Sequence, residues 1–208
     1  MRQSWVRRGG APFPCRELAR RAAWVTLRRM ELTIHTPTTA PEASRALLDG
    51  IAADIGVLPN LVAAVAESPA LLTGFDGLRR AIAESTLPPI AREVAGLAVG
   101  VVVDNRYGVA FHSTVLGRHG VEAAEIERMR AGRPPSDPKL AAVYELAQRI
   151  VLDRGKVDTA AATAAGWTHE QILEIVGECA FVGLVGMIDN LAGRVALDDF
   201  LKPQEWAP

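Results

Sequence analysis

The stretch 88-PPIAREVAGLAVGVVVDNRYGVAFHSTVLGRHG-120 contains two apolar runs of helical character, separated by the polar break Asp104–Arg106. A Pro pair opens the first run, as is common in the first turn of a helix. This run holds one acid, Glu93, and the second run holds His112. Burying an unpaired carboxylate is costly. We therefore expect Glu93 to have a partner, and His112 is the nearest suitable side chain.

The spacing within these runs predicts how the two helices meet. Residues three and seven positions apart lie on one face of a helix. In the first run, this spacing places Glu93, Gly96 and Gly100 on one face. In the second run, it places Asn105, Gly108 and His112 on one face. Glycine has no side chain, so it allows another backbone to approach closely. We expect the helices to cross at Gly96 and Gly100 and to bring Glu93 toward the face of His112.

These residues resemble a motif of the carboxymuconolactone decarboxylase and alkylhydroperoxidase D-like superfamily. Its peroxidase branch carries a Glu, a Cys-x-x-Cys twelve residues later, and a His four residues after the second Cys. Glu93 and His112 match the Glu and the His, whereas the two cysteine positions are Asn105 and Gly108. The resemblance to the peroxidase-related branch runs from roughly His35 to the end of the chain. It includes 35-HTPTTAPEASRALLDGIAADIGVLPNLVAAVAESPALLTGF-75, the Leu-Pro-Pro before the acid run, and 165-AGWTHEQILEIV-176.

The fold class expected from the residues is all-α. Hydrophobic residues make up 49% of the chain and aromatic residues only 5%, which favours closely packed helices with Ala, Val, Leu and Ile cores. No alternation typical of strands occurs. The resemblance further implies an alkylhydroperoxidase D-like helical bundle that assembles as a homo-oligomer, a trimer or a hexamer. Helices are predicted at Pro41–Ile55, Pro59–Glu67, Ser68–Ser85, 88–103, Arg106–His119, Val121–Ala131, Asp137–Asp153, Thr159–Ala165 and Thr168–Leu191.

Two interpretations of the Glu93–His112 pair stay open on the sequence alone. As a catalytic pair, the carboxylate orients the imidazole and keeps its pKa near neutral pH, where it can act as acid or base. As a structural pair, the two side chains form an ion pair that ties two helices together.

The residues beside the break are candidate substrate-binding groups. Asn105 is a candidate hydrogen-bond donor to a substrate oxygen, and Tyr107 is a candidate proton donor at short range. Gly108 occupies the second thiol position, and Arg106 is a candidate partner for an anionic substrate. Each also has a structural interpretation, because Asn is common at helix starts, Gly permits close crossings, and Arg at a helix end is often solvated.

Three functions follow from these residues. The first is a cofactor-free acid–base enzyme, of decarboxylase or isomerase type, that acts on a small carboxylate or lactone. The resembling decarboxylase branch also lacks the Cys-x-x-Cys and uses no metal. The second is an alkylhydroperoxidase-like peroxidase, which needs one thiol to attack the peroxide and another to resolve the product. Asn105 and Gly108 supply neither. The third is a non-catalytic, oligomeric relative.

Composition also argues against several other classes of protein. The formal net charge of −1 argues against a general nucleic-acid binder. The longest uncharged apolar runs span about ten residues, short of the roughly 20 that cross a membrane. Cys15 and Cys179 are far apart, which indicates neither a disulfide framework nor a metal site. We therefore expect a cytoplasmic protein without a metal or other cofactor.

Residues 1–29 differ from the rest of the chain. They are rich in Arg and hold one acid, Glu17. They contain no continuous apolar core of the secretory type. We interpret them as an arm outside the domain, which spans residues 30–208. Two explanations remain open for the arm, a transit-peptide-like segment or an upstream start with Met30 as the initiator.

Overall fold

The structure is a computed structural model that describes residues 29–207. The predicted Arg-rich arm, Arg29 apart, and Cys15 lie outside the described residues. Within residues 29–207 the chain is all-α, as predicted, and forms nine α-helices, one short 3-10 helix and no strand. The α-helices are α2 (Glu42–Ile55), α3 (Asn60–Val65), α4 (Pro69–Ala83), α5 (Pro89–Val102), α6 (Arg106–Arg118), α7 (Ala123–Arg130), α8 (Pro138–Leu152), α9 (Ala160–Ala164) and α10 (His169–Leu191), followed by the 3-10 helix η2 (Lys202–Gln204).

All nine predicted helices are present, each with ends within about two residues of the expected bounds. Side-chain caps explain several of the starts. The hydroxyl of Ser68 accepts from the backbone N–H of Leu71 at 3.3 Å, and Asp137 caps α8 in the same way. Thr168 and Gln171 exchange two hydrogen bonds at the start of α10. Each cap pairs backbone groups that a helix end leaves unsatisfied.

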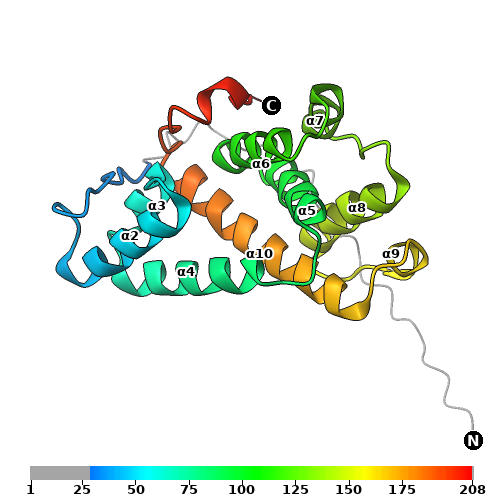
Figure 1. Ribbon diagram of the computed structural model, residues 1–208, viewed down its shortest axis with the longest axis horizontal. Coiled ribbons are helices and arrows are strands. Elements are labelled where there is room, and N and C mark those ends of the chain that lie inside the picture. Colours follow the sequence, from blue (N-terminus) through cyan, green and yellow to red (C-terminus); the bar gives the residue numbers. More distant parts are fainter. Residues whose placement is uncertain (1–28, 208) are drawn as a thin grey trace, which may run out of the picture.

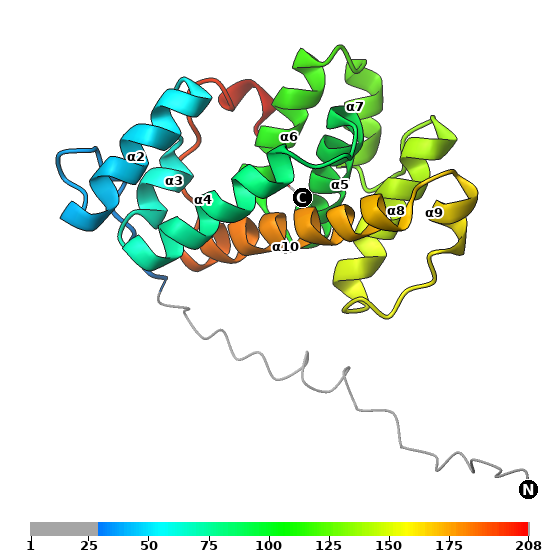
Figure 2. The same cartoon turned by 60° about the horizontal axis from the view of Figure 1, so that its bottom comes forward.

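The long helix α10 connects two groups of helices. At one end of the molecule lie α2, α3 and α4, and at the other lie α5 to α9 (Figure 1). Helix α4 runs beside α10 (Figure 2), and α10 also contacts α5, α6 and α8. By length and composition alone α10 could cross a membrane. Here it packs against four helices of its own chain and buries two acids, Glu178 and Asp189, as a core helix does.

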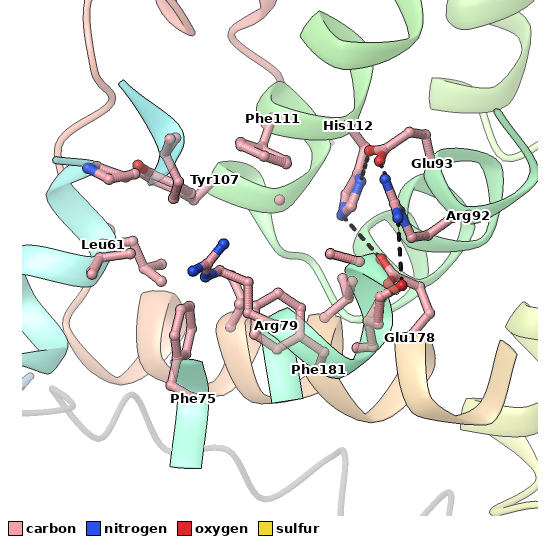
Figure 3. Close-up of a pocket in the computed structure, with 18 residues that line it drawn as sticks. Leu61, Phe75, Arg79, Arg92, Glu93, Tyr107, Phe111, His112, Glu178 and Phe181 are labelled. Carbon is pink, nitrogen blue, oxygen red and sulfur yellow. Dashed lines mark hydrogen bonds and ion pairs between the residues drawn. The ribbon is translucent and has the colours of Figure 1, made fainter. Parts of the chain in front are cut away.

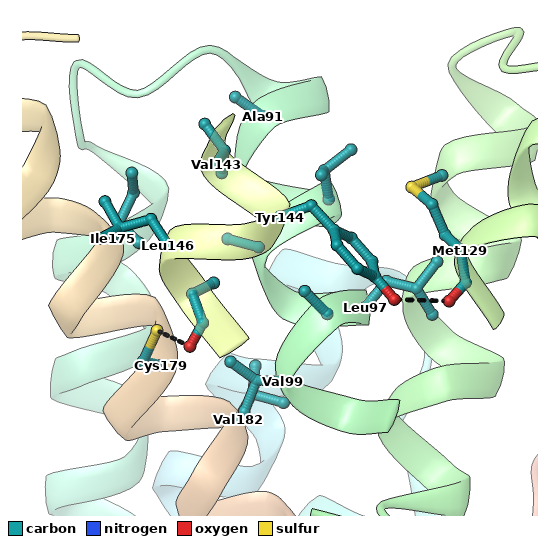
Figure 4. Packing of buried hydrophobic residues seen from close by; sticks show 14 of the residues in the cluster. Ala91, Leu97, Val99, Met129, Val143, Tyr144, Leu146, Ile175, Cys179 and Val182 are labelled. Carbon is teal, nitrogen blue, oxygen red and sulfur yellow. Dashed lines mark hydrogen bonds between the residues drawn. The ribbon is translucent and has the colours of Figure 1, made fainter. Parts of the chain in front are cut away.

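The buried apolar side chains form two clusters that meet along α6 and α10. The first cluster is centred on α5, which packs against α6, α7, α8 and α10. Figure 4 shows part of it, in which the hydroxyl of Tyr144 donates to the backbone carbonyl of Met129 at 2.7 Å. The second cluster joins α2, α3, α4, the first turns of α6 and the chain after α10.

The segment after α10 was not predicted from the sequence. It contains no long helix, but it buries Val195, Leu197 and Leu201 in the second cluster. The carboxylate of Asp189 accepts a hydrogen bond from the backbone N–H of Val195 at 2.7 Å and thereby fixes the turn that follows α10. The segment then continues to η2, which packs on α6. Its structure comes from contacts with distant helices rather than from a local periodic pattern.

Candidate active site

A cavity of about 230 Å³ lies where the two core clusters meet. Its walls are mainly apolar. Arg92, Glu93, His112 and Glu178 gather at one side, on α5, α6 and α10, whereas Arg79 of α4 and Tyr107 lie apart from them (Figure 3). One of the residues that line it, Ile55, is 38% exposed. The lining residues are Ile55, Pro59, Leu61, Val62, Phe75, Arg79, Ile82, Ala83, Arg92, Glu93, Tyr107, Gly108, Phe111, His112, Glu178, Phe181, Val182 and Val185.

Glu93 and His112 are in contact and both line the cavity. Oε2 of Glu93 lies 2.8 Å from Nδ1 of His112, and both side chains are buried. The crossing occurs at the predicted glycines. A Cβ at Gly96 would overlap the imidazole ring, and a Cβ at Gly100 would lie 3.3 Å from the backbone nitrogen of Val109. The glycines of α5 therefore create the space in which His112 reaches Glu93.

The two charges shift each other's pKa values in opposite directions. Burial raises the pKa of Glu93, but the hydrogen bond and the charge of His112, followed by Arg92, outweigh it and leave that pKa below the ordinary value. Burial lowers the pKa of His112, but the hydrogen bond and charge of Glu93, with a further contribution from Glu178, raise it above the ordinary value. The charged forms of both groups are therefore favoured.

Arg92 extends this pair on the Glu93 side. Its Nε lies 3.4 Å from Oε1 of Glu93, the carboxylate oxygen that His112 does not contact. Its Nη1 donates to the backbone carbonyl of Ile82 at 3.4 Å. Arg92 thus contacts both the carboxylate and the end of α4, and it helps to fix the orientation of Glu93.

Glu178 on α10 is a site residue that the sequence analysis missed. Its Oε1 lies 3.9 Å from Nε2 of His112, on the side of the ring opposite Glu93 (Figure 3). Burial raises the pKa of Glu178 to about 7, with the Glu93 charge adding to the rise while His112 and Arg92 act against it. A signal was present in part, because Glu178 is the one acid between Ile175 and Ile188 of an apolar helical run, a criterion similar to the one that singled out Glu93.

Tyr107 lines the cavity, but its hydroxyl is engaged in a hydrogen bond. It donates to Oδ2 of Asp198, which also accepts from the backbone N–H of Asn60 at 3.3 Å. Burial first, and then the hydrogen bond to Asp198, raise the pKa of Tyr107 above its ordinary value. The ring therefore forms a wall of the cavity, while the hydroxyl ties α6 to the segment after α10.

The other candidates beside the break have structural partners. Oδ1 of Asn105 accepts from the backbone N–H of Gly108 at 2.7 Å as the N-cap of α6, and Nδ2 donates to the carbonyl of Val182 at 3.3 Å. Asn105 does not line the cavity. Gly108 does, and a Cβ there would overlap the Asn105 amide. Arg106 lies outside the cavity lining and pairs with Glu205.

Cys179 follows Glu178 but faces the apolar core. Its Sγ lies 3.7 Å from the backbone carbonyl of Ala147 (Figure 4). Burial raises the pKa of the thiol to about 12, with a smaller contribution from the Glu178 charge. The thiolate is the reactive form of cysteine, and this environment suppresses it. No group of three His, Cys, Asp or Glu side chains within residues 29–207 is placed to hold a metal ion.

Comparison with known proteins identifies the fold. No protein-family model and no curated protein matches the chain. Among solved structures, the chain is similar to an uncharacterised peroxidase-related protein from Ralstonia eutropha with an alkylhydroperoxidase AhpD core. The TM-score is 0.71 and the identity 19%, over 81% of this chain and 92% of the other. For an uncharacterised peroxidase-related protein from a Silicibacter species, the TM-score is 0.68 and the identity 15%, over 82% of this chain and 92% of the other.

A third similar structure is the debrominase Bmp8, solved in complex with 2,3,4-tribromopyrrole. It gives a TM-score of 0.68 and 16% identity, over 85% of this chain and 97% of the other. These similarities confirm the predicted resemblance at the level of the fold. The chain has the helical fold of the AhpD-like, peroxidase-related proteins.

Proposed function

We propose that this protein is a cofactor-free acid–base enzyme, of decarboxylase or isomerase type, that acts on a small carboxylate or lactone. The observation that carries the proposal is the 2.8 Å contact between Glu93 Oε2 and His112 Nδ1 at the wall of a cavity. A structural ion pair has no need of a cavity beside it, whereas a proton-transfer pair does.

His112 is the group that moves the proton. Only the neutral imidazole can take a proton on Nε2, and this form prevails above the raised pKa of His112. In it the Glu93 carboxylate favours the tautomer with hydrogen on Nδ1, which leaves the lone pair on Nε2. Nε2 lies on the side of the ring that faces Glu178 across the cavity wall. Glu93 orients the ring and stabilises the imidazolium that forms after Nε2 takes a proton. Arg92 in turn holds the second oxygen of Glu93.

The lining supports a small substrate with one polar end. Three phenylalanines, Phe75, Phe111 and Phe181, form much of the apolar wall, and the cavity volume of about 230 Å³ limits the size of the occupant. Arg79 and Arg92 bring positive charge to the lining, although Arg79 is already paired with Asp76 at 2.6 Å and Arg92 with Glu93 at 3.4 Å. A carboxylate or a lactone carbonyl directed toward the arginines fits this arrangement.

The fold similarity to peroxidase-related proteins supports a second candidate, a thiol peroxidase. The residues oppose it, because the family's thiol positions are Asn105 and Gly108, and the Cys179 thiol is buried with a pKa of about 12. A non-catalytic relative is the third candidate. We further propose that the protein is a cytoplasmic homo-oligomer.

Hydrogen exchange into a simple lactone tests the proposal. The protein is incubated in D₂O with 5-methyl-2(3H)-furanone, a small unsaturated lactone, and loss of the proton next to the carbonyl is followed by NMR. We expect catalysed exchange that falls by roughly 100-fold in His112→Ala, the size of a typical general-base contribution. Removal of a surface ion pair by Asp199→Asn with Lys202→Gln serves as the control. Exchange in His112→Ala at the wild-type rate contradicts the proposal.

A further inference from the structure

The imidazole of His112 lies between two carboxyl groups, and it is hydrogen-bonded to only one of them. Nδ1 contacts Glu93 at 2.8 Å, whereas Nε2 lies 3.9 Å from Oε1 of Glu178. The second separation is too long for a hydrogen bond. Glu178 and Nε2 therefore form two separate groups that line the same cavity side by side (Figure 3).

We propose that Glu178 is a second catalytic residue, which donates a proton to the substrate from which Nε2 of His112 has taken one. The reaction of this site is then an isomerisation, in which a proton moves between two substrate atoms on one face of the molecule. This inference rests on the proposed function and narrows it to one reaction type, on an unsaturated lactone or acid with an acidic C–H beside its carbonyl.

Three features of Glu178 support a proton-donor role. The group is buried, with 3% of the residue exposed, and hydrogen bonds do not contribute to its pKa. Its own helix holds no Lys or Arg, and the one histidine of that helix, His169, is exposed at its first position. Burial favours the neutral, proton-bearing form of a carboxyl, and at Glu178 it outweighs the opposing charges of His112 and Arg92, which gives the pKa of about 7. The charged groups that face it from α5 and α6 are Arg92, Glu93 and His112.

The proposed step conserves protons and electrons. Nε2 takes the proton from the carbon beside the carbonyl, and the C–H electron pair moves into the π system to give a dienolate. The far carbon of this dienolate takes the proton from Glu178, and the carbon–carbon double bond moves into conjugation with the carbonyl. The site is left with an imidazolium and a carboxylate 3.9 Å apart. After product release, Nε2 gives its proton to solvent water and Glu178 takes one from it, which restores the starting state with no net acid or base consumed.

The lactone 5-methyl-2(3H)-furanone separates the two roles, because exchange needs only the base, and conversion to the conjugated 5-methyl-2(5H)-furanone needs the donor as well. We expect Glu178→Gln to lose roughly 100-fold or more of the isomerisation, and to change exchange in D₂O much less, through the pKa of His112, which the Glu178 charge helps to raise. Glu170→Gln is the matched control, since it removes an exposed carboxylate from the same helix. The wild-type isomerisation rate should fall at low pH, where His112 holds a proton on Nε2, and again at high pH, where Glu178 has lost its proton, because the step needs a neutral imidazole and a protonated carboxyl.

The outcomes distinguish this inference from the proposed function. Wild-type isomerisation rates in Glu178→Gln, or exchange without isomerisation in the wild type, overturn the role of Glu178 and leave His112 as a base. Absence of catalysed exchange in the wild type overturns both proposals. Carboxyl ¹³C NMR of the free protein gives a readout independent of turnover. A Glu178 signal, assigned by its loss in Glu178→Gln, that titrates at the ordinary carboxyl pKa contradicts the donor role.

Discussion

Gly96 on α5 lies against the imidazole of His112 on α6, at a distance that only glycine allows. An ideal Cβ at position 96 would lie 2.6 Å from Nδ1 and 2.5 Å from Nε2 of the ring. His112 cannot move aside without loss of its hydrogen bond to Glu93. The absence of one side chain on α5 therefore determines whether the acid and the base can meet.

Replacement of Gly96 by Ala should separate the pair. Overpacking of a buried contact costs about 1–3 kcal/mol, and we expect a loss of stability in this range, measured by urea unfolding. Gly74→Ala in α4 is the matched control, because a Cβ there meets nothing within 4 Å. It should stabilise the protein by up to about 1 kcal/mol through helix propensity. Equal effects at the two positions would show that His112 is not held against α5.

Glu93 and His112 should be energetically coupled. Glu93→Gln and His112→Ala should each destabilise the fold, and the double variant should cost less than the sum of the two by roughly 1 kcal/mol or more. The reason is that each single change leaves a buried polar partner unpaired. Chemical unfolding of the four proteins measures this difference. Additive effects would place the side chains apart and remove the acid–base pair from the mechanism.

The same coupling should depend on pH in a defined window. The pKa of Glu93 is lowered, so its contribution is present above the ordinary carboxyl value of 4.5 and is lost as the pH falls through the lowered value. The pKa of His112 is raised, so its contribution is present below 6.5 and is lost as the pH rises through the raised value. The double-variant cycle should therefore give its largest coupling between about pH 4.5 and 6.5.

The sequence predicted the pair but not its surroundings. Helical spacing places Glu93 and Gly96 on one face of α5, so the crossing with His112 could be anticipated from the pattern. The roles of Asn105 and Tyr107 could not, because their partners, Val182 and Asp198, are distant in the chain. A residue type indicates which hydrogen bonds are possible, and only the packed chain decides which groups receive them.

Glu178 should destabilise the protein at neutral pH. Its pKa of about 7 lies above the ordinary 4.5, so the folded state binds more protons than the unfolded state between these values. Stability should fall as the pH rises across this interval. Glu178→Gln removes the titrating group and should gain up to about 3 kcal/mol relative to the wild type between pH 4.5 and pH 8. Thermal or urea unfolding at both pH values tests this, and a constant difference would show that Glu178 ionises normally.

Dithiol peroxidase activity should be absent. A thiol at the Cys179 position has a pKa of about 12 and contacts the core rather than the cavity. Turnover of an organic hydroperoxide with a dithiol reductant should remain at background in the wild type. If activity does occur, two variants show whether a thiol is responsible for it. Its loss in Cys179→Ala would assign a role to that thiol, and its persistence in a variant without Cys15 and Cys179 would indicate a route without thiols.

Helix α10 exposes an apolar stripe formed by Leu173, Val176, Met187 and Leu191. Their side chains recur at helical spacing along the full helix, and their exposed fractions range from 42% to 71%. Scattered exposed leucines are ordinary, whereas an aligned apolar face on a long helix is typical of a protein contact. Further copies of the chain offer the same stripe, and like faces can meet around a two-fold axis, as in a hexamer, or around a three-fold axis, as in a trimer.

We therefore expect the protein to be a homo-oligomer in solution, a trimer or a hexamer, with α10 at a contact between copies. Met187→Glu places a charge on the stripe and should shift the assembly toward smaller species at micromolar concentration, as measured by light scattering. Leu152→Glu on α8 is the control, because Leu152 is 58% exposed and lies outside the stripe. A monomeric wild type would exclude the assembly. An oligomer that tolerates Met187→Glu would place its contacts on another face, since a buried unpaired charge at such a contact is strongly unfavourable.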